Sequence, residues 1–127
     1  MKCSRKFLKC AHCGNIVGVI DDRGPAILCC GEPMKAMVPN TTDAAQEKHV
    51  PVATRSGDSL IVQVGSALHP MSEEHHIAWL MVAQEGFTQR ADLEHTGEPK
   101  ATFAVRAGDA TVYAYCNLHG LWAADVQ

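Results

Sequence analysis

The 127-residue sequence has no long apolar run and no dense basic segment. No stretch approaches the ~18 apolar residues that a transmembrane helix needs. The opening residues MKCSRKFLKC also lack the apolar core of a secretory signal. Lys and Arg are scattered and number 11 against 14 Asp and Glu, which gives a formal net charge of -3. These absences argue against a membrane or nucleic-acid partner, and we expect a cytoplasmic protein.

Apolar residues at helical spacing are also missing over any length that would make an ordinary helix, and the best helical candidate is the short polar segment DAAQEKH. Short runs rich in Val, Ile, Thr and aromatic residues dominate instead, with turn sequences such as RSGDS and RAGDA between them. These runs are HVPVATR, SLIVQVG, HIAWLMVA, ATFAVR, TVYAYC and LWAADV. Six or seven short strands in the last ~80 residues predict an all-β fold, an antiparallel immunoglobulin-like β-sandwich.

Cysteine is unevenly distributed, because five of the six cysteines lie within the first thirty residues. We therefore expect a small metal-binding module over residues 1–36, a polar linker over 37–46 and a main domain over 47–127. A segment of about 36 residues cannot bury a self-sufficient core, so something other than packing must stabilise the module.

The module contains the motifs KCAHCGNIV and LCCGEPM, in which Cys10-x2-Cys13 and the adjacent Cys29 and Cys30 are each followed by a glycine. Four thiolates suit a tetrahedral site for iron or zinc, and the number of sulfurs does not separate the two metals. Free or disulfide-bonded cysteines are the alternative, which a reducing compartment disfavours. Neighbouring residues of an extended chain point to opposite faces, so Cys29 and Cys30 can share an ion only if the backbone bends there. Cys3 lies outside the pattern and is interpreted as a spare thiol.

The main domain combines a single cysteine with six histidines, most of which lie at the ends of strand-like runs. In CNLHGLW, Cys116 and His119 are three residues apart just after a strand-like run. Strand ends can converge at one rim of a sandwich, and this pairing favours a metal site over isolated surface histidines. The six histidines are His49, His69, His75, His76, His95 and His119.

Taken together, CAHCGNIV, CCGEPMK, EKHVPV, HPMSEEHHIAW and CNLHGLW resemble the desulfoferrodoxins, the two-iron class of superoxide reductases. The resemblance covers nearly the whole chain in both order and spacing. It implies a desulforedoxin-like module with a distorted Fe(Cys)4 centre whose ligands are Cys10, Cys13, Cys29 and Cys30. It also implies a second, catalytic iron with four equatorial nitrogens and an axial sulfur, from His49, His69, His75, His119 and Cys116.

Two further positions follow from the resemblance, and one departs from it. Glu47 and Lys48, in EKH, match the family's pair beside an open sixth coordination position. The family often has tyrosine at the position of His76. Periodicity leaves the choice between His75 and His76 open, and the motif alone selects His75 as the ligand. His95 matches no ligand position and is expected to be solvated.

The resemblance implies that ferrous iron passes one electron to superoxide, that Lys48 attracts the anion and supplies protons, and that hydrogen peroxide is formed. It further implies a rubredoxin-like electron donor and a homodimer. Three alternatives remain: a two-iron electron carrier without superoxide activity, a superoxide dismutase, and a zinc-stabilised binding module whose histidines are incidental. The carrier would form no peroxide from superoxide, the dismutase would form half a peroxide per superoxide without a donor, and the zinc module would be colourless.

Overall fold

The computed structural model describes residues 1–127 and forms two compact units. One unit is Arg5–Val38, and the other comprises Met1–Ser4 together with Pro39–Gln127. The domain limits expected from the sequence stay a prediction. No helix in the structure has the length and apolar character that a membrane crossing requires.

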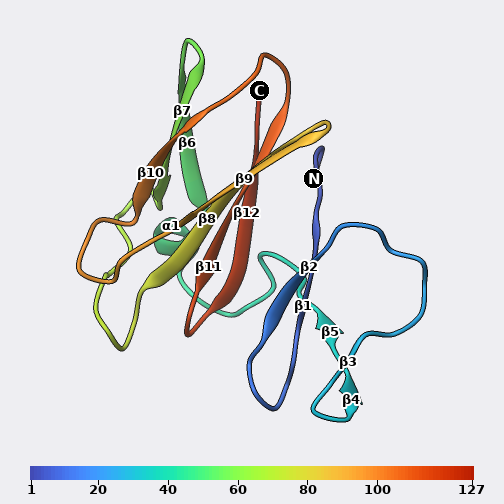
Figure 1. Cartoon of the computed structure of the whole chain (residues 1–127). Coiled ribbons are helices and arrows are strands. Elements are labelled where there is room, and N and C mark those ends of the chain that lie inside the picture. The colour runs from blue at the N-terminus through green and yellow to red at the C-terminus, as the bar shows by residue number, and fades with distance from the viewer. The chain divides into compact units, whose positions relative to one another are not determined.

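The larger unit is built from seven strands in two antiparallel sheets (Figure 1). One sheet has the order β10-β7-β6, with strands Lys100–Ala104, Ser59–Val64 and Pro51–Ser56. The other has the order β12-β11-β8-β9, with strands Gly120–Val126, Ala110–Cys116, Ile77–Gln84 and Phe87–Asp92. The predicted all-β antiparallel fold class is therefore confirmed.

The core of this unit follows from the alternation of its strands. In β7, Leu60, Val62 and Val64 are fully buried, while the residues between them are partly exposed. They form one cluster with residues of β8, β10 and β11. Each such buried side chain contributes about 1.5–3 kcal/mol to folding. Cys116, the last residue of β11, belongs to the same cluster, so one end of the core leads directly into the histidine-rich loops.

Two details differ from the predicted strands. The run HVPVATR is not a strand from its first residue, because His49 ends the one-turn helix α1, Gln46–His49, and β6 begins at Pro51. The predicted runs also omit β9, whose sequence FTQRAD is polar and alternately exposed. A strand at the edge of a sheet can be stable with little apolar content, which removes the signal on which strand prediction depends.

The smaller unit has only short strands and a minimal core. Its three-stranded sheet has the order β2-β1-β5, with strands Ile16–Val19, Lys6–Lys9 and Lys35–Ala36. A separate hairpin pairs β3, Leu28–Cys29, with β4, Glu32–Pro33. The only buried side chains here are Phe7, Leu8 and Cys10.

Candidate metal centres

Four cysteine sulfurs come together in the smaller unit. The Sγ atoms of Cys10, Cys13, Cys29 and Cys30 all lie within 4.8 Å of one another, and those of Cys13 and Cys29 are 3.6 Å apart. Ligands at the corners of a tetrahedron with metal–sulfur bonds of about 2.3 Å are about 3.8 Å from one another. The cluster therefore has the dimensions of a tetrahedral metal–thiolate site.

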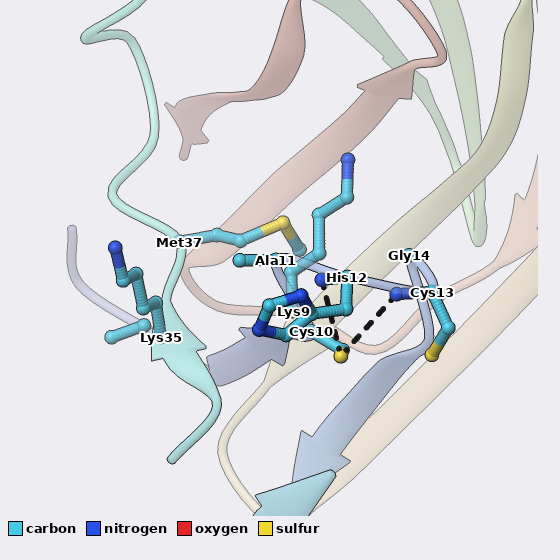
Figure 2. A pocket seen from close by; sticks show the side chains of 9 residues that line it. Lys9, Cys10, Ala11, His12, Cys13, Gly14, Lys35 and Met37 are labelled. Atoms are coloured by element: carbon cyan, nitrogen blue, oxygen red, sulfur yellow. Dashed lines mark hydrogen bonds between the residues drawn. The ribbon is translucent and has the colours of Figure 1, made fainter. Parts of the chain in front are cut away.

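The turn after β1 directs peptide N–H groups at the sulfur of Cys10. The N–H groups of His12 and Cys13 donate to it at 3.4 and 3.5 Å, as Figure 2 shows, and Gly14 follows with a φ of 81°. Hydrogen bonds from Cys13 and His12 lower the pKa of Cys10 to about 6. Donors aimed at a sulfur stabilise its thiolate, which is the form that binds a metal ion.

The adjacent pair Cys29 and Cys30 meets the predicted requirement for a bend. Cys30 has a φ of 53° and Gly31 a φ of 79°, so two successive residues adopt the left-handed conformation. This conformation costs a residue other than glycine roughly 1–2 kcal/mol. Without it, the two sulfurs would point to opposite faces of the chain. The backbone is thus bent where both sulfurs must reach one ion.

Crowding of the four sulfurs also fits a cation among them. The neighbouring sulfurs of Cys13 and Cys10 raise the pKa of the Cys30 thiol to about 12, and Cys13 likewise raises the pKa of Cys29. Four thiolates at this separation cannot coexist without positive charge to offset their repulsion. A divalent or trivalent ion supplies that charge, and sulfur ligands select iron or zinc.

The second cluster is assembled from loops at strand ends of the larger unit. His49 ends α1, His69 follows β7, and His75 lies two residues before the start of β8. Cys116 ends β11, and His119 lies in the turn between β11 and β12. The donor atoms of His49, His75, Cys116 and His119 all lie within 4.8 Å of one another. The Nε2 atom of His69 adjoins this group, 3.2 Å from Nε2 of His49 and 3.4 Å from Sγ of Cys116.

The four imidazoles form a closed ring. Neighbours in the order His49, His69, His75 and His119 have centroids 4.5–5.0 Å apart and nearly perpendicular planes. Across the ring, His49 and His75 are 6.3 Å apart with planes inclined by 30°. Nitrogens at adjacent corners of a square, each about 2.1 Å from an ion, are about 3.0 Å apart. The measured separations of 3.1 Å from His49 to His119 and 3.2 Å from His49 to His69 match that geometry.

The burial of the donor atoms is a second test of whether this cluster suits a metal ion. Nε2 of His75 is buried and has no hydrogen-bond partner. Buried polar atoms are nearly always satisfied, so an unpartnered nitrogen on an imidazole of this ring calls for a ligand. Cys116 is fully buried, and its Sγ accepts the peptide N–H of His119 at 3.4 Å. Nitrogen ligands with one thiolate suit iron and related transition metals.

Protonation states agree with this interpretation. Burial lowers the pKa of His49 and of His75, and it lowers the pKa of His69 to about 4. These imidazoles are therefore neutral at pH 7, as metal ligands must be. Burial raises the pKa of Cys116, so an incoming cation would replace its proton.

The helix α1 carries the other two predicted site residues. Glu47 and Lys48 are exposed and directly precede the buried His49. This turn is held in place through its own backbone, because the carbonyl oxygen of Glu47 accepts hydrogen bonds from the peptide N–H of Ala67 and the hydroxyl of Ser66. A Cβ placed at Gly65 would lie only 2.6 Å from that oxygen. Only glycine allows the segment before His69 to approach α1 this closely.

Several residues considered from the sequence stay outside both clusters. Cys3 contacts the carbonyl oxygen of Asp109 through its sulfur. His12 is exposed, and its Nε2 lies 2.9 Å from a carboxylate oxygen of Glu32. His76 and His95 lie beside each other, with ring centroids 5.9 Å apart, so His95 is only partly in solvent. The structure brings His75, and not His76, to the ring of imidazoles.

Sequence reasoning missed two residues that shape the second cluster, Gly65 and Asn117, whereas Trp122 has the packing role that is usual for a large aromatic side chain next to a strand end. Trp122 is 1% exposed, and its ring lies 4.9 Å from that of His49. Gly65 and Asn117 hold loops that carry ligands. The glycine just after a strand-like run and the asparagine within CNLHG were available as signals, but neither indicates by itself which distant segment it contacts.

Comparison with known proteins gives matches over both units. The desulfoferrodoxin family model matches residues 41–125, and the model of the desulfoferrodoxin N-terminal domain matches residues 4–37. A desulfoferrodoxin homolog from Archaeoglobus fulgidus is 48% identical over 90% of this chain and 91% of its own length. The desulfoferrodoxin of Nitratidesulfovibrio vulgaris is 44% identical over 94% of this chain and 95% of its own.

Among solved structures, the chain is similar to the superoxide reductase from Treponema pallidum. The two share 35% sequence identity with a TM-score of 0.77, and the match covers 95% of this chain and 98% of the other. The likeness thus extends over both units.

Proposed function

The chain belongs to the desulfoferrodoxin family, and we propose that it is a superoxide reductase, which converts superoxide to hydrogen peroxide by adding one electron and two protons. The observation that carries this proposal is the closed ring of four imidazoles with a buried thiol beside it. Similarity to proteins named superoxide reductase supports the choice of substrate.

Each cluster holds one iron ion in this proposal. The ligands of the first are Cys10, Cys13, Cys29 and Cys30, and those of the second are His49, His69, His75, Cys116 and His119. Ferrous iron bound at the second site supplies the electron that superoxide receives. The peptide N–H of His119 withdraws electron density from the sulfur of Cys116. This hydrogen bond limits the electron donation that would otherwise favour cleavage of the O–O bond.

The two catalytic residues outside the ligand set are Lys48 and Glu47. The larger unit has six Lys and Arg against eleven Asp and Glu, so its overall field repels an anion. Lys48 places a positive charge next to His49, and a local charge prevails because distant ones are screened beyond about 8–10 Å. Nζ of Lys48 attracts superoxide and donates a proton, with water supplying the second. The carboxylate of Glu47, on the same exposed turn, is suited to displace the product.

Electrons come from outside the chain in this scheme. We propose a rubredoxin-like protein as the donor, with the first iron relaying or storing electrons and stabilising the small module over residues 1–36. Residues 37–46 then serve as the linker and residues 47–127 as the reductase domain. A cytoplasmic homodimer is the working form that we propose, in keeping with the family.

The decisive experiment measures the yield of hydrogen peroxide per superoxide consumed, using the iron-loaded protein with and without a reductant. A reductase gives one peroxide per superoxide and consumes one electron from the donor each time. A yield of one half that is unchanged by donor would refute the proposal in favour of a dismutase. Reversible redox spectra without any peroxide would favour the two-iron electron carrier.

A further inference from the structure

The four imidazoles of the second cluster are not held in the same way. The ring of His49 donates from Nδ1 to the carbonyl oxygen of Ala45 at 2.7 Å, and that of His69 donates from Nδ1 to Pro70 at 2.7 Å. Such hydrogen bonds fix the tautomer and orientation of a metal-binding imidazole. The hydrogen bonds of His75, in contrast, all involve its backbone, and its buried Nε2 has none. No hydrogen bond to its ring orients His75, so the placement of this imidazole depends on packing and on the chain on either side of it.

Asn117 contacts the chain at both of those points. Its Oδ1 accepts the peptide N–H of His76 at 2.9 Å, and its Nδ2 donates to the carbonyl oxygen of Glu74 at 2.9 Å. Its own peptide N–H donates to the carbonyl oxygen of His76 at 3.2 Å. Three hydrogen bonds from one residue thus bracket His75.

The position of Asn117 in the fold links its hydrogen bonds around His75 to the position of the Cys116 sulfur. The β8–β11 ladder has an irregularity between Tyr115 and Cys116 and ends where Cys116 pairs with Ile77. Asn117 is the next residue, so its bonds to the loop before β8 continue the pairing beyond the regular strands. Any movement of Asn117 changes the position of His75 relative to Cys116.

We propose that the side chain of Asn117 is the positioning residue of His75, holding this imidazole in the ring by clamping the backbone on both sides of it. The inference rests on the ligand set in the proposed function. It concerns how one ligand is held and does not depend on which substrate the iron reduces.

The test uses the iron-loaded full chain with Asn117 replaced by alanine or leucine. Leucine has a similar volume but cannot form the hydrogen bonds, so it separates clamping from packing. The matched control is Gln84→Ala, which removes a two-point side-chain clamp on the peptide of Arg106 at the far end of β8. The readouts are the rate of iron loss to a chelator and the thiolate-to-iron absorption of the oxidised protein.

Both Asn117 variants should lose iron from the histidine site about ten- to a hundredfold faster than the unmodified protein. Their absorption band should shift, while iron release from the four-cysteine site in the same sample stays unchanged. Gln84→Ala should lower thermal stability without changing either readout.

Unaltered iron loss and an unaltered spectrum in both N117A and N117L would overturn the role proposed for Asn117 and leave the ligand assignment intact. A histidine site that takes up no iron in the unmodified protein would overturn the ligand assignment and the clamp with it. The peroxide yield decides separately whether the activity proposal holds.

Discussion

In the smaller unit, three of the four cluster sulfurs are at least partly exposed, and only two apolar side chains besides Cys10 are buried. In the larger unit, the ring of imidazoles lies at the end of a core that includes the wholly buried strand β11, and Cys116 is part of that core. The smaller unit therefore depends on metal binding at the cysteine cluster for its folded structure. The histidine cluster, in contrast, is positioned by the folded core of the larger unit.

The difference appears in the backbone as well. The cysteine cluster depends on a left-handed Cys30 and on turns that point N–H groups at sulfur. The histidine cluster depends on contacts between segments far apart in sequence, such as Gly65 with Glu47 and Asn117 with Glu74. A local motif can be formed by a short peptide once a metal is bound, whereas the second arrangement needs a folded sandwich.

The largest expected effect is that of losing the first metal. Cys30→Ala removes one ligand, and metal binding contributes about 10 kcal/mol to the folding of small metal-dependent units. Residues Arg5–Val38 should then lose amide protection in hydrogen exchange, while β6–β12 keep theirs. The comparison variant is His75→Ala, which should leave the sandwich protected. Equal loss of protection in both units after Cys30→Ala would contradict the contrast drawn above.

The next effect tests whether the histidine cluster is held by backbone packing rather than by metal. Gly65→Ala places a methyl carbon 2.6 Å from the carbonyl oxygen of Glu47 and must displace α1. Overpacking of this kind costs about 1–3 kcal/mol. The loss should appear in urea unfolding of metal-free protein as well. Gly97→Ala is the control, because its nearest neighbour would be at 3.5 Å. Equal stability of G65A and G97A would show that the close approach is not needed.

The sequence was sufficient to predict the fold class, and the residues that it indicated as ligands lie together in two clusters, although their role as metal ligands stays a prediction. Alternation in SLIVQVG indicates a strand with one buried face, and the structure places Leu60, Val62 and Val64 in the core. The spacing of Cys10 and Cys13 with an adjacent cysteine pair is short-range, so it can be interpreted without knowing the fold. The polar edge strand β9 gave no comparable signal.

Other features depend on three-dimensional contacts that no local pattern encodes. The order of imidazoles around the ring follows from how four loops meet. The close approach of Gly65 to Glu47 joins residues 18 positions apart, and the hydrogen bonds of Asn117 to residues 76 and 74 span 41 and 43 positions. Contacts over such separations form only through tertiary packing. The start of β6 also differs from the predicted one, because His49 ends a helical turn and the strand begins only at Pro51.

A smaller effect concerns how the acidic larger unit receives an anion. Lys48→Ala should slow the reaction with superoxide about tenfold and flatten its dependence on ionic strength, since the local attractive charge is lost. Stability should be unchanged, because Lys48 is exposed. Lys100→Ala is the matched control, as it removes an exposed lysine of the same unit that pairs with Glu98. The measurement is pulse-radiolysis kinetics over a range of salt. Identical salt slopes for K48A and the unmodified protein would argue against a role for this lysine.

The smallest expected effect concerns Asp125, whose carboxylate accepts hydrogen bonds from the N-terminal segment and from β11. The peptide N–H of Lys2 and the hydroxyl of Thr111 both donate to Oδ1 of Asp125, at 3.0 and 2.7 Å, and the Thr111 bond is the main cause of the lowered pKa of Asp125. A carboxyl whose pKa is lower when folded stabilises the protein above its unfolded pKa and loses that contribution as pH falls through the folded value. Asp125→Asn should therefore cost about 0.5 kcal/mol at pH 7, a figure kept small because the carboxyl is exposed, and less near pH 2. Urea midpoints at the two pH values measure this difference. A cost that is the same at both would mean that neither Thr111 nor the peptide N–H of Lys2 stabilises the charged carboxylate.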